Sequence, residues 1–366
     1  MGRFLTRTSL IFITTFYSLE GQVYYEADPF NLLEYEKKTF ENNYLKSPFI
    51  LRPSFLTIGE GKHQRWSIRV RAEYFENDGA PNLENSSSRW IGKGISRYRS
   101  LRVGYSNKFF SFTFEPYHFV NENLNYPVPL RKGIYTRMND TRPYGDSTLV
   151  VSGVNEFQVF FHHSGVGIGV SNANMWWGPG LHSSLQMSNN APAFRYFSFG
   201  TTGEKRFNDL GIDLRYIFSL MDDKNIGTPY FSALLFSWTY YSNPQFTFGF
   251  TRSYLSGPGN KTWDWDISMK DALMLPFEEL FLEDKQTDPD NPESAVDLWD
   301  EILVGYVVAS FPSSGLKMYV EYGRDDHAWD WDDFTRQPDH SGASVMGLRK
   351  YGLFGNTTIV AGLEYT

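Results

Sequence analysis

The chain has 366 residues, of which 17% are aromatic, with 31 glycines and no cysteine. These values favour a β-rich protein over a helical bundle, and they exclude disulfides and cysteine-based metal sites. The formal net charge of −8 argues against a nucleic-acid-binding protein, which would present a basic surface.

The first 22 residues have the pattern of a secretory signal peptide. Arg3 and Arg7 precede an apolar run over residues 10–19, which is followed by small and polar residues around Gly21. This order is typical of a leader that is removed on export. No later apolar run is long enough for a transmembrane helix, which leaves a soluble protein or a β-barrel as alternatives.

A short helix is expected next. Asp28 can cap a helix that begins at Pro29, because proline is favoured in the first helical turn. We therefore predict a helical, periplasmic segment over residues 23–48 and a barrel over residues 49–366.

From about residue 65, apolar and polar residues alternate with a period of two. In 65–74, Trp66, Ile68 and Val70 fall on one face, and Arg69 and Arg71 fall on the other. Such alternation predicts β-strands with one apolar face, and it recurs at 101–105, 110–114, 157–161, 166–170, 246–250, 316–322 and 359–365. A soluble β-sandwich alternates in the same way, so this pattern alone leaves both folds open.

The lengths of the connections separate the two folds. Short turns near 106–108, 163–165, 242–244, 312–315 and 352–355 alternate with long polar connections near 76–96, 119–148, 174–192, 256–300 and 325–343. Short periplasmic turns and long outer loops are typical of outer-membrane barrels, and a sandwich has no reason to sort its loops this way. We predict an all-β, antiparallel transmembrane β-barrel in the cell outer membrane, with apolar faces on lipid and charged faces on the lumen.

The strand count and the direction of the last strand do not fit a closed barrel. About thirteen or fourteen strands can be assigned, and the last, near 357–365, runs outward, whereas bacterial barrels close with an even number. Either C-terminal strands are missing from this chain, or one strand near 49–57 is miscounted.

Two stretches resemble the capsule assembly Wzi family, in forms like those of Bacteroidetes. They are "NANMWWGPGLHSSLQMSNNA" at 172–191 and "VEYGRDDHAWDWDDFTRQPDHSGASVMGLRK" at 320–350. The resemblance implies a barrel of about 18 strands with periplasmic helices. It also implies a lectin-like protein that binds and organises capsular or exopolysaccharide noncovalently, without enzymatic activity or a cofactor. We expect a monomer in contact with outer-membrane lipid, and polysaccharide-export proteins are candidate partners.

Candidate ligand-binding residues lie in both stretches. In the first, Trp176 and Trp177 could stack on sugar rings, with polar groups from Asn174, Asn189 and Asn190 nearby. The alternative is that Trp176 packs inside the barrel as part of a plug and Trp177 joins an interfacial aromatic belt.

In the second stretch, tryptophan and aspartate alternate in Trp329, Asp330, Trp331 and Asp332. This pattern could bind a sugar through ring stacking and hydroxyl hydrogen bonds. Tryptophans of the membrane interface with solvated aspartates would show the same pattern.

Two other functional classes stay open. A diffusion porin shares every barrel feature and predicts an open lumen. A hydrolase is less favoured, because His182 and Ser183 are not part of a nucleophile elbow. The acid-rich loop at 283–301 lacks the glycine and terminal glutamate spacing of an EF-hand, so we expect no metal site there.

Overall fold

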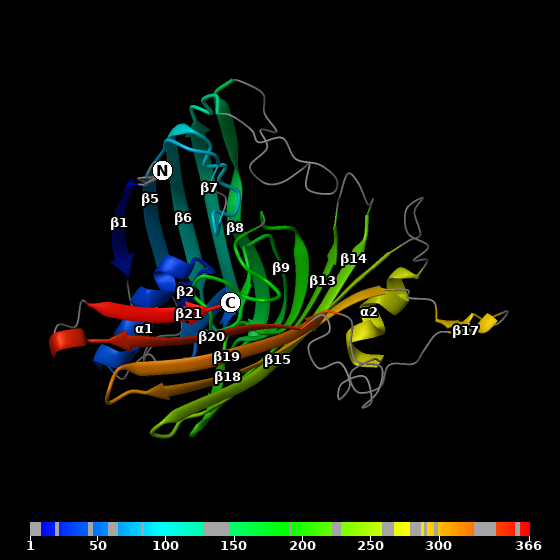
Figure 1. The fold of residues 1–366 in the computed structure, drawn as a ribbon. Coiled ribbons are helices and arrows are strands. Elements are labelled where there is room, and N and C mark those ends of the chain that lie inside the picture. The colour runs from blue at the N-terminus through cyan, green and yellow to red at the C-terminus, as the bar shows by residue number, and fades with distance from the viewer. Residues whose placement is uncertain are drawn as a thin grey trace, which may run out of the picture.

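The structure is a computed structural model, and it describes residues 9–18, 22–42, 47–57, 65–81, 84–126, 147–190, 192–221, 228–257, 267–278, 287–288, 291–295, 299–325, 342–355 and 359–366. Most of them belong to one antiparallel sheet that curls into a wall (Figure 1).

Fourteen strands of this sheet follow one another in chain order. They are β1 (Ser9–Ser18), β5 (Arg65–Asn77), β6 (Gly94–Ser106), β7 (Phe110–Asn121), β8 (Leu149–His163), β9 (Val166–Ser171), β11 (Tyr196–Thr201), β13 (Leu210–Leu220), β14 (Tyr230–Tyr240), β15 (Gln245–Ser256), β18 (Trp299–Phe311), β19 (Leu316–Asp325), β20 (Gly342–Tyr351) and β21 (Val360–Tyr365). A fifteenth, β12 (Lys205–Phe207), pairs with β13. The predicted antiparallel barrel fold is confirmed, and β1 and β21 are the two ends of the order over the described residues. β1 falls within residues 1–22 and is paired with β5 in this structure; the signal peptide there stays a prediction.

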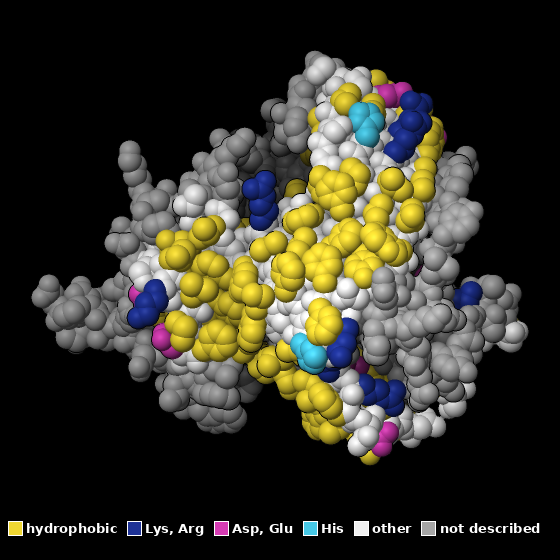
Figure 2. Space-filling model, turned by 180° about the vertical axis from the view of Figure 1, so that it is seen from behind, with side chains coloured by type: hydrophobic (Ala, Val, Ile, Leu, Met, Phe, Trp, Pro, Cys, Tyr) yellow, Lys and Arg dark blue, Asp and Glu magenta, His cyan; other side chains and the backbone are white. Residues whose placement is uncertain are grey.

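Side-chain exposure along β5 shows which face of the wall points outward. Trp66 and Ile68 are 52% and 51% exposed, whereas Arg69 and Arg71 are 7% and 5% exposed. A soluble protein has the opposite arrangement. Figure 2 shows apolar side chains gathered in a broad band across the wall as seen from behind. The apolar face of the strands therefore points outward, as a lipid-facing wall requires.

The strand connections alternate in length as predicted. The turn between β6 and β7 is short because the Asn107 Oδ1 accepts hydrogen bonds from the backbone N–H groups of Phe109 and Phe110, at 2.7 and 2.8 Å, in an Asx turn. The connection from β7 to β8 spans 122–148. One end of the wall thus carries the short turns and the other carries the long connections.

The N-terminal segment lies inside the curve of the sheet (Figure 1). It contains β2 (Gln22–Tyr25), α1 (Pro29–Asn42), β3 (Leu51–Arg52) and β4 (Ser54–Thr57), and β2 pairs with β4. The helix begins at Pro29 as predicted. Residues 49–57, where a wall strand was in question, belong to this inner segment and not to the wall.

The connection between β15 and β18 holds α2 (Met269–Glu278), β16 (Thr287–Asp288) and β17 (Asn291–Ala295), and the short helix η2 (Leu353–Gly355) follows β20. The Ser268 Oγ caps α2 by accepting a hydrogen bond from the Asp271 N–H at 3.2 Å. Of the helices that the structure describes, none has the length and apolar character needed to cross a membrane.

An outward-facing wall predicts a depth-dependent cost for an added charge. Val70 lies in the middle of β5, and Val150 lies at the long-connection end of β8; both are exposed. We expect Val70→Arg to lower the free energy of unfolding in phospholipid vesicles by about 2–4 kcal/mol and Val150→Arg by about 0–1 kcal/mol. Urea titration followed by heat-modifiable gel mobility measures both. Equal, small losses at the two positions would show that this face does not contact lipid.

Candidate functional site

Two segments enter the barrel from opposite ends and meet in its interior. The N-terminal segment follows β1 at the short-turn end, and the connection after β9 enters from the long-connection end. They pair as β3 with β10 (Trp176–Trp177). The Gly178 N–H also donates to the Ile50 carbonyl at 3.0 Å. We call residues 22–42, 47–57 and 172–190 together the plug.

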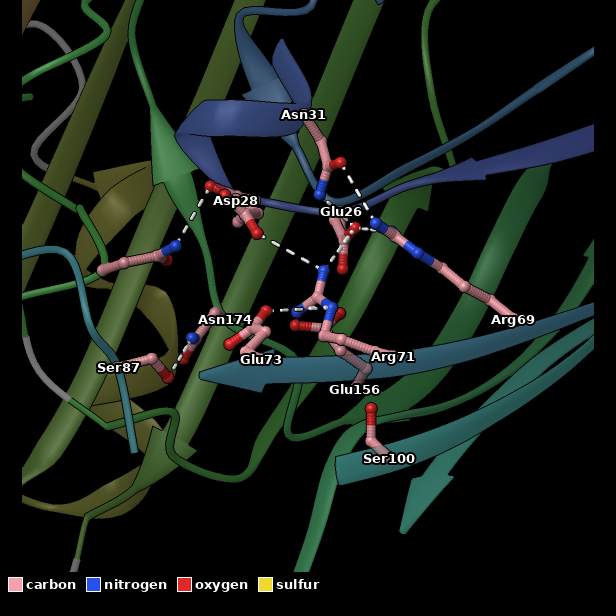
Figure 3. Close-up of polar contacts among 12 residues, drawn as sticks. Glu26, Asp28, Asn31, Arg69, Arg71, Glu73, Ser87, Ser100, Glu156 and Asn174 are labelled. Carbon is pink, nitrogen blue, oxygen red and sulfur yellow. Dashed lines mark hydrogen bonds and ion pairs between the residues drawn. The ribbon is translucent and has the colours of Figure 1, made fainter. Parts of the chain in front are cut away.

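Glu26 of the plug binds three arginines of the wall, and Figure 3 shows two of them, Arg69 and Arg71. Its carboxylate accepts hydrogen bonds from Arg71 Nη2 at 2.9 Å, from Arg102 Nη1 at 2.9 Å and from Arg69 Nη1. Burial alone would raise the pKa of Glu26, but the three positive charges outweigh it and hold the pKa well below its usual range. The inward arginines of β5 thus bind the plug and do not line an open channel.

The same network continues toward the long-connection end. Arg71 lies 3.3 Å from Asp28, and Arg89 lies 2.5 Å from Glu73. Burial raises the pKa of Asp28, and the charge of Arg71 only partly offsets this. The charged side chains that the sequence placed on the inner face are therefore paired, mostly with the plug.

A second carboxylate, Glu36 on α1, joins the plug to the opposite part of the wall. Arg349 forms two hydrogen bonds to it, Nε to Oε2 and Nη2 to Oε1, both at 2.9 Å, and Lys317 and Tyr351 also donate to it. Burial alone would raise the pKa of Glu36, but the positive charges of Arg349 and Lys317 outweigh this effect and lower the pKa to about 2. Arg349 Nη2 also donates to the Pro179 carbonyl at 2.8 Å. One arginine thus holds both halves of the plug.

Two inward carboxylates hold the Gly-Pro-Gly turn by its backbone. Glu321 of β19 accepts the N–H groups of Gly180 and Leu185, each at 3.2 Å. Glu364 of β21 accepts three successive N–H groups at 2.8–3.0 Å, from Leu181, His182 and Ser183. Such runs of N–H groups are natural anion sites, and here glutamates of the wall occupy them.

Glycine is needed where this turn approaches the wall. Gly178 has a φ of +142°, and a Cβ there would lie 2.1 Å from the Glu321 Oε1. A Cβ on Gly180 would lie 2.0 Å from the Ser183 carbonyl oxygen. The Gly-Pro-Gly sequence is thus explained by close contact inside the barrel.

Trp176 and Trp177 are buried in the plug, at 0% and 1% exposure. Trp177 packs in an inner apolar core with Ile50, Leu51 and Phe231. The Arg52 guanidinium lies 5.4 Å from the centroid of the Trp176 ring, a cation–π contact that stabilises this buried charge. Neither tryptophan lies at the outer mouth with a face open for sugar stacking, as the ligand-binding interpretation required. The packing matches the plug alternative for Trp176, and Trp177 is in the plug as well and not in an interfacial belt.

The predicted asparagines link the plug to the long connection after β5. Buried Asn174 donates to the Ser87 Oγ, and the Ser87 N–H donates to the Asn189 carbonyl at 2.8 Å. Asn190 is exposed, and its Oδ1 accepts the Asn85 N–H at 2.9 Å. We call the surface formed by residues 84–90 and 182–190 the outer rim.

The outer rim is polar. His182 Nε2 lies 2.9 Å from the Glu84 Oε1, and both side chains are at least half exposed. Trp329, Asp330, Trp331 and Asp332 lie outside the described residues, so only Asn190 of the predicted ligand-binding set is placed on the described surface. Within the described part of the chain, no group of three or more His, Cys, Asp or Glu side chains is arranged to hold a metal ion.

Glu36→Gln is expected to loosen the plug. It leaves Lys317 and Arg349 buried without a charged partner, which costs about 3–5 kcal/mol. Because the pKa of Glu36 is depressed from 4.5 to about 2, its contribution is complete above pH 4.5 and is lost as the pH falls toward 2. Hydrogen exchange of α1 measures both effects, with exposed Glu34→Gln on the same helix as the control. Equal exchange in the two variants would contradict the role given to Glu36.

Gly180→Ala is expected to expel the turn from its position between Glu321 and Glu364. Limited proteolysis of the folded protein should then cut within residues 178–190, where the wild type resists. Gly305→Ala is the control, because a Cβ there meets nothing within 4 Å. Resistance of Gly180→Ala equal to that of Gly305→Ala would show that the turn tolerates a side chain.

Comparison with known proteins agrees with this architecture. The family model "Capsule assembly protein Wzi" matches residues 64–356, which covers the wall from β5 to the turn after β20 and includes both stretches quoted from the sequence. A search of curated proteins found no match, and a search of solved structures found none either. The family match covers well over half of the chain, and the chain therefore belongs to the Wzi family of capsule assembly proteins.

Proposed function

We propose that this outer-membrane capsule assembly protein holds capsular or related exopolysaccharide at its outer mouth, noncovalently, through many individually weak contacts. The main support for this proposal is that charged side chains of the described inner face form ion pairs with carboxylates of the plug. A polymer that approaches from outside then meets the outer rim and the long connections, and not an open channel.

The state of the lumen also bears on the porin alternative. A diffusion channel needs water-exposed charges along its inner wall. Here Arg71, Arg102 and Arg349 are 7% exposed or less and bind carboxylates of the plug. This pairing favours a binding protein over a porin.

The outer rim offers the chemistry that sugars need. The imidazole of His182, the carboxylate of Glu84 and the amide of Asn190 are exposed there. Such groups bond sugar hydroxyls, while aromatic rings stack on sugar C–H faces. We assign the stacking role to Trp329 and Trp331, with Asp330 and Asp332 bonding hydroxyls beside them. Trp176 and Trp177 instead hold the plug in place.

The mechanism is multivalent. A polysaccharide repeats its unit, so one chain can engage several weak sites in turn and gain avidity without any strong single contact. No bond in the sugar is made or broken in this proposal. Export proteins that deliver the polymer are proposed partners, and a monomer is sufficient.

Retention of the native capsular polysaccharide by protein in nanodiscs tests the assignment. We expect Trp329→Ala/Trp331→Ala to weaken binding about tenfold or more, the equivalent of about 1.4 kcal/mol, and Asn190→Ala to weaken it less. Phe354→Ala is the control, because Phe354 is an aromatic residue that is 95% exposed at the short-turn end. Undiminished retention by the tryptophan double variant would show that these residues are not part of the site. A loss of binding in Phe354→Ala equal to that in the double variant would contradict the placement of the site at the outer mouth.

A further inference from the structure

The helix α2 packs against the outward face of the wall. Its buried residues Ala272 and Leu275 contact a cluster that includes Tyr216, Tyr254 and Trp299, and the Tyr216 hydroxyl donates to the Leu273 carbonyl at 2.9 Å. Figure 1 shows α2 beside the ends of the strands near β14 and β15.

The strand register fixes the side on which α2 lies. Tyr216 lies two residues after Leu214 in β13, and Leu214 is 45% exposed on the outer face. Tyr254 pairs with Glu301 of β18. In β15 it lies on the same face as Arg252, Phe250 and Phe248, which follow at steps of two residues, and Phe248 is 41% exposed. Residues two apart in a strand share a face, so α2 covers positions of the wall that would otherwise face lipid.

An ion pair lies beside these positions on β15 and β18. Arg252 binds Glu301 through two hydrogen bonds, Nε to Oε1 at 3.1 Å and Nη2 to Oε2 at 2.8 Å, and both side chains are 5% exposed or less. Both residues point outward by the same register. A bare ion pair on a lipid-facing wall would be costly, and here both side chains are buried.

The surface of α2 that faces away from the wall has two different sides. Met269, Met274 and Phe277 are 49%, 40% and 48% exposed. Asp271 and Glu278 are also exposed, and at 100° per residue they fall together, next to Met274. Exposed Lys270 falls between Phe277 and Met274, where its aliphatic stem can lie along the apolar side chains while its ammonium reaches water. A helix that lies flat on a membrane protein with apolar side chains along one exposed side and charged side chains beside them has the two-sided character of an interfacial helix.

We propose that α2 is a lipid-binding interfacial helix, which inserts Met274 and Phe277 among the lipids of the outer leaflet and keeps its acidic side in water. Two observations select lipid as the occupant. The apolar side of α2 continues the outward apolar band, which runs on along β13 from Tyr216 to exposed Leu214. Three half-exposed side chains also offer only a few hundred Å², well below the roughly 800 Å² that each partner gives to a stable protein interface.

Single-cysteine labelling tests this proposal, because the chain has no cysteine of its own. The full-length protein carrying Phe277→Cys is labelled with the fluorophore NBD and reconstituted into phosphatidylcholine vesicles. We expect severalfold stronger quenching by doxyl-labelled phosphatidylcholine than by aqueous iodide. Glu278→Cys on the acidic side of the same helix is the matched control, with the opposite preference expected.

Met274→Cys provides a second site if the loss of the Phe277 ring weakens docking, and heat-modifiable mobility confirms that each variant is folded. Strong iodide quenching at positions 274, 277 and 278 alike would show that α2 faces water and would overturn the proposal. Protection from both quenchers at 274 and 277 would show that protein covers the helix, such as a second copy of this chain, and would also overturn it.

Discussion

The structure depends on how the polar inner face of the wall is satisfied. Strands such as β5 place arginines and glutamates inward where their apolar neighbours face outward, and a buried charge without a partner is strongly destabilising. Glu26 and Glu36 of the plug meet this need, the first with Arg69, Arg71 and Arg102 and the second with Lys317 and Arg349. The wall and the plug therefore stabilise each other.

The same constraint explains the Gly-Pro-Gly turn. The turn brings a row of backbone N–H groups against Glu321 and Glu364, and its Pro179 carbonyl accepts from Arg349, which also holds Glu36. The halves of the plug that enter from opposite ends thus share one arginine. In the function proposed here, a polymer meets the outer surface of such a filled barrel and not its lumen, and this would link the buried charges to a role in holding capsule.

The wall was predictable from local patterns, because a period of two and the sorting of short and long connections are written in neighbouring residues. The helix at Pro29 was predictable for the same reason. The partners of the inward charges were not: Glu26 and Glu36 lie far in sequence from the arginines they bind, and no local signal pairs them. Trp176 and Trp177 resemble a sugar platform by composition, and only the pairing of β10 with β3 shows that they are buried. The packing of α2 on the outward positions Tyr216 and Tyr254 likewise follows from strand register and not from the loop sequence.

Ion conductance of the folded wild-type protein in a planar lipid bilayer tests the central claim most directly, because it reports on the lumen and not on any single contact. A barrel whose inner charges are bonded to the plug should insert without opening a steady conductance. Steady, water-filled-channel conductance from correctly folded wild type would contradict this account.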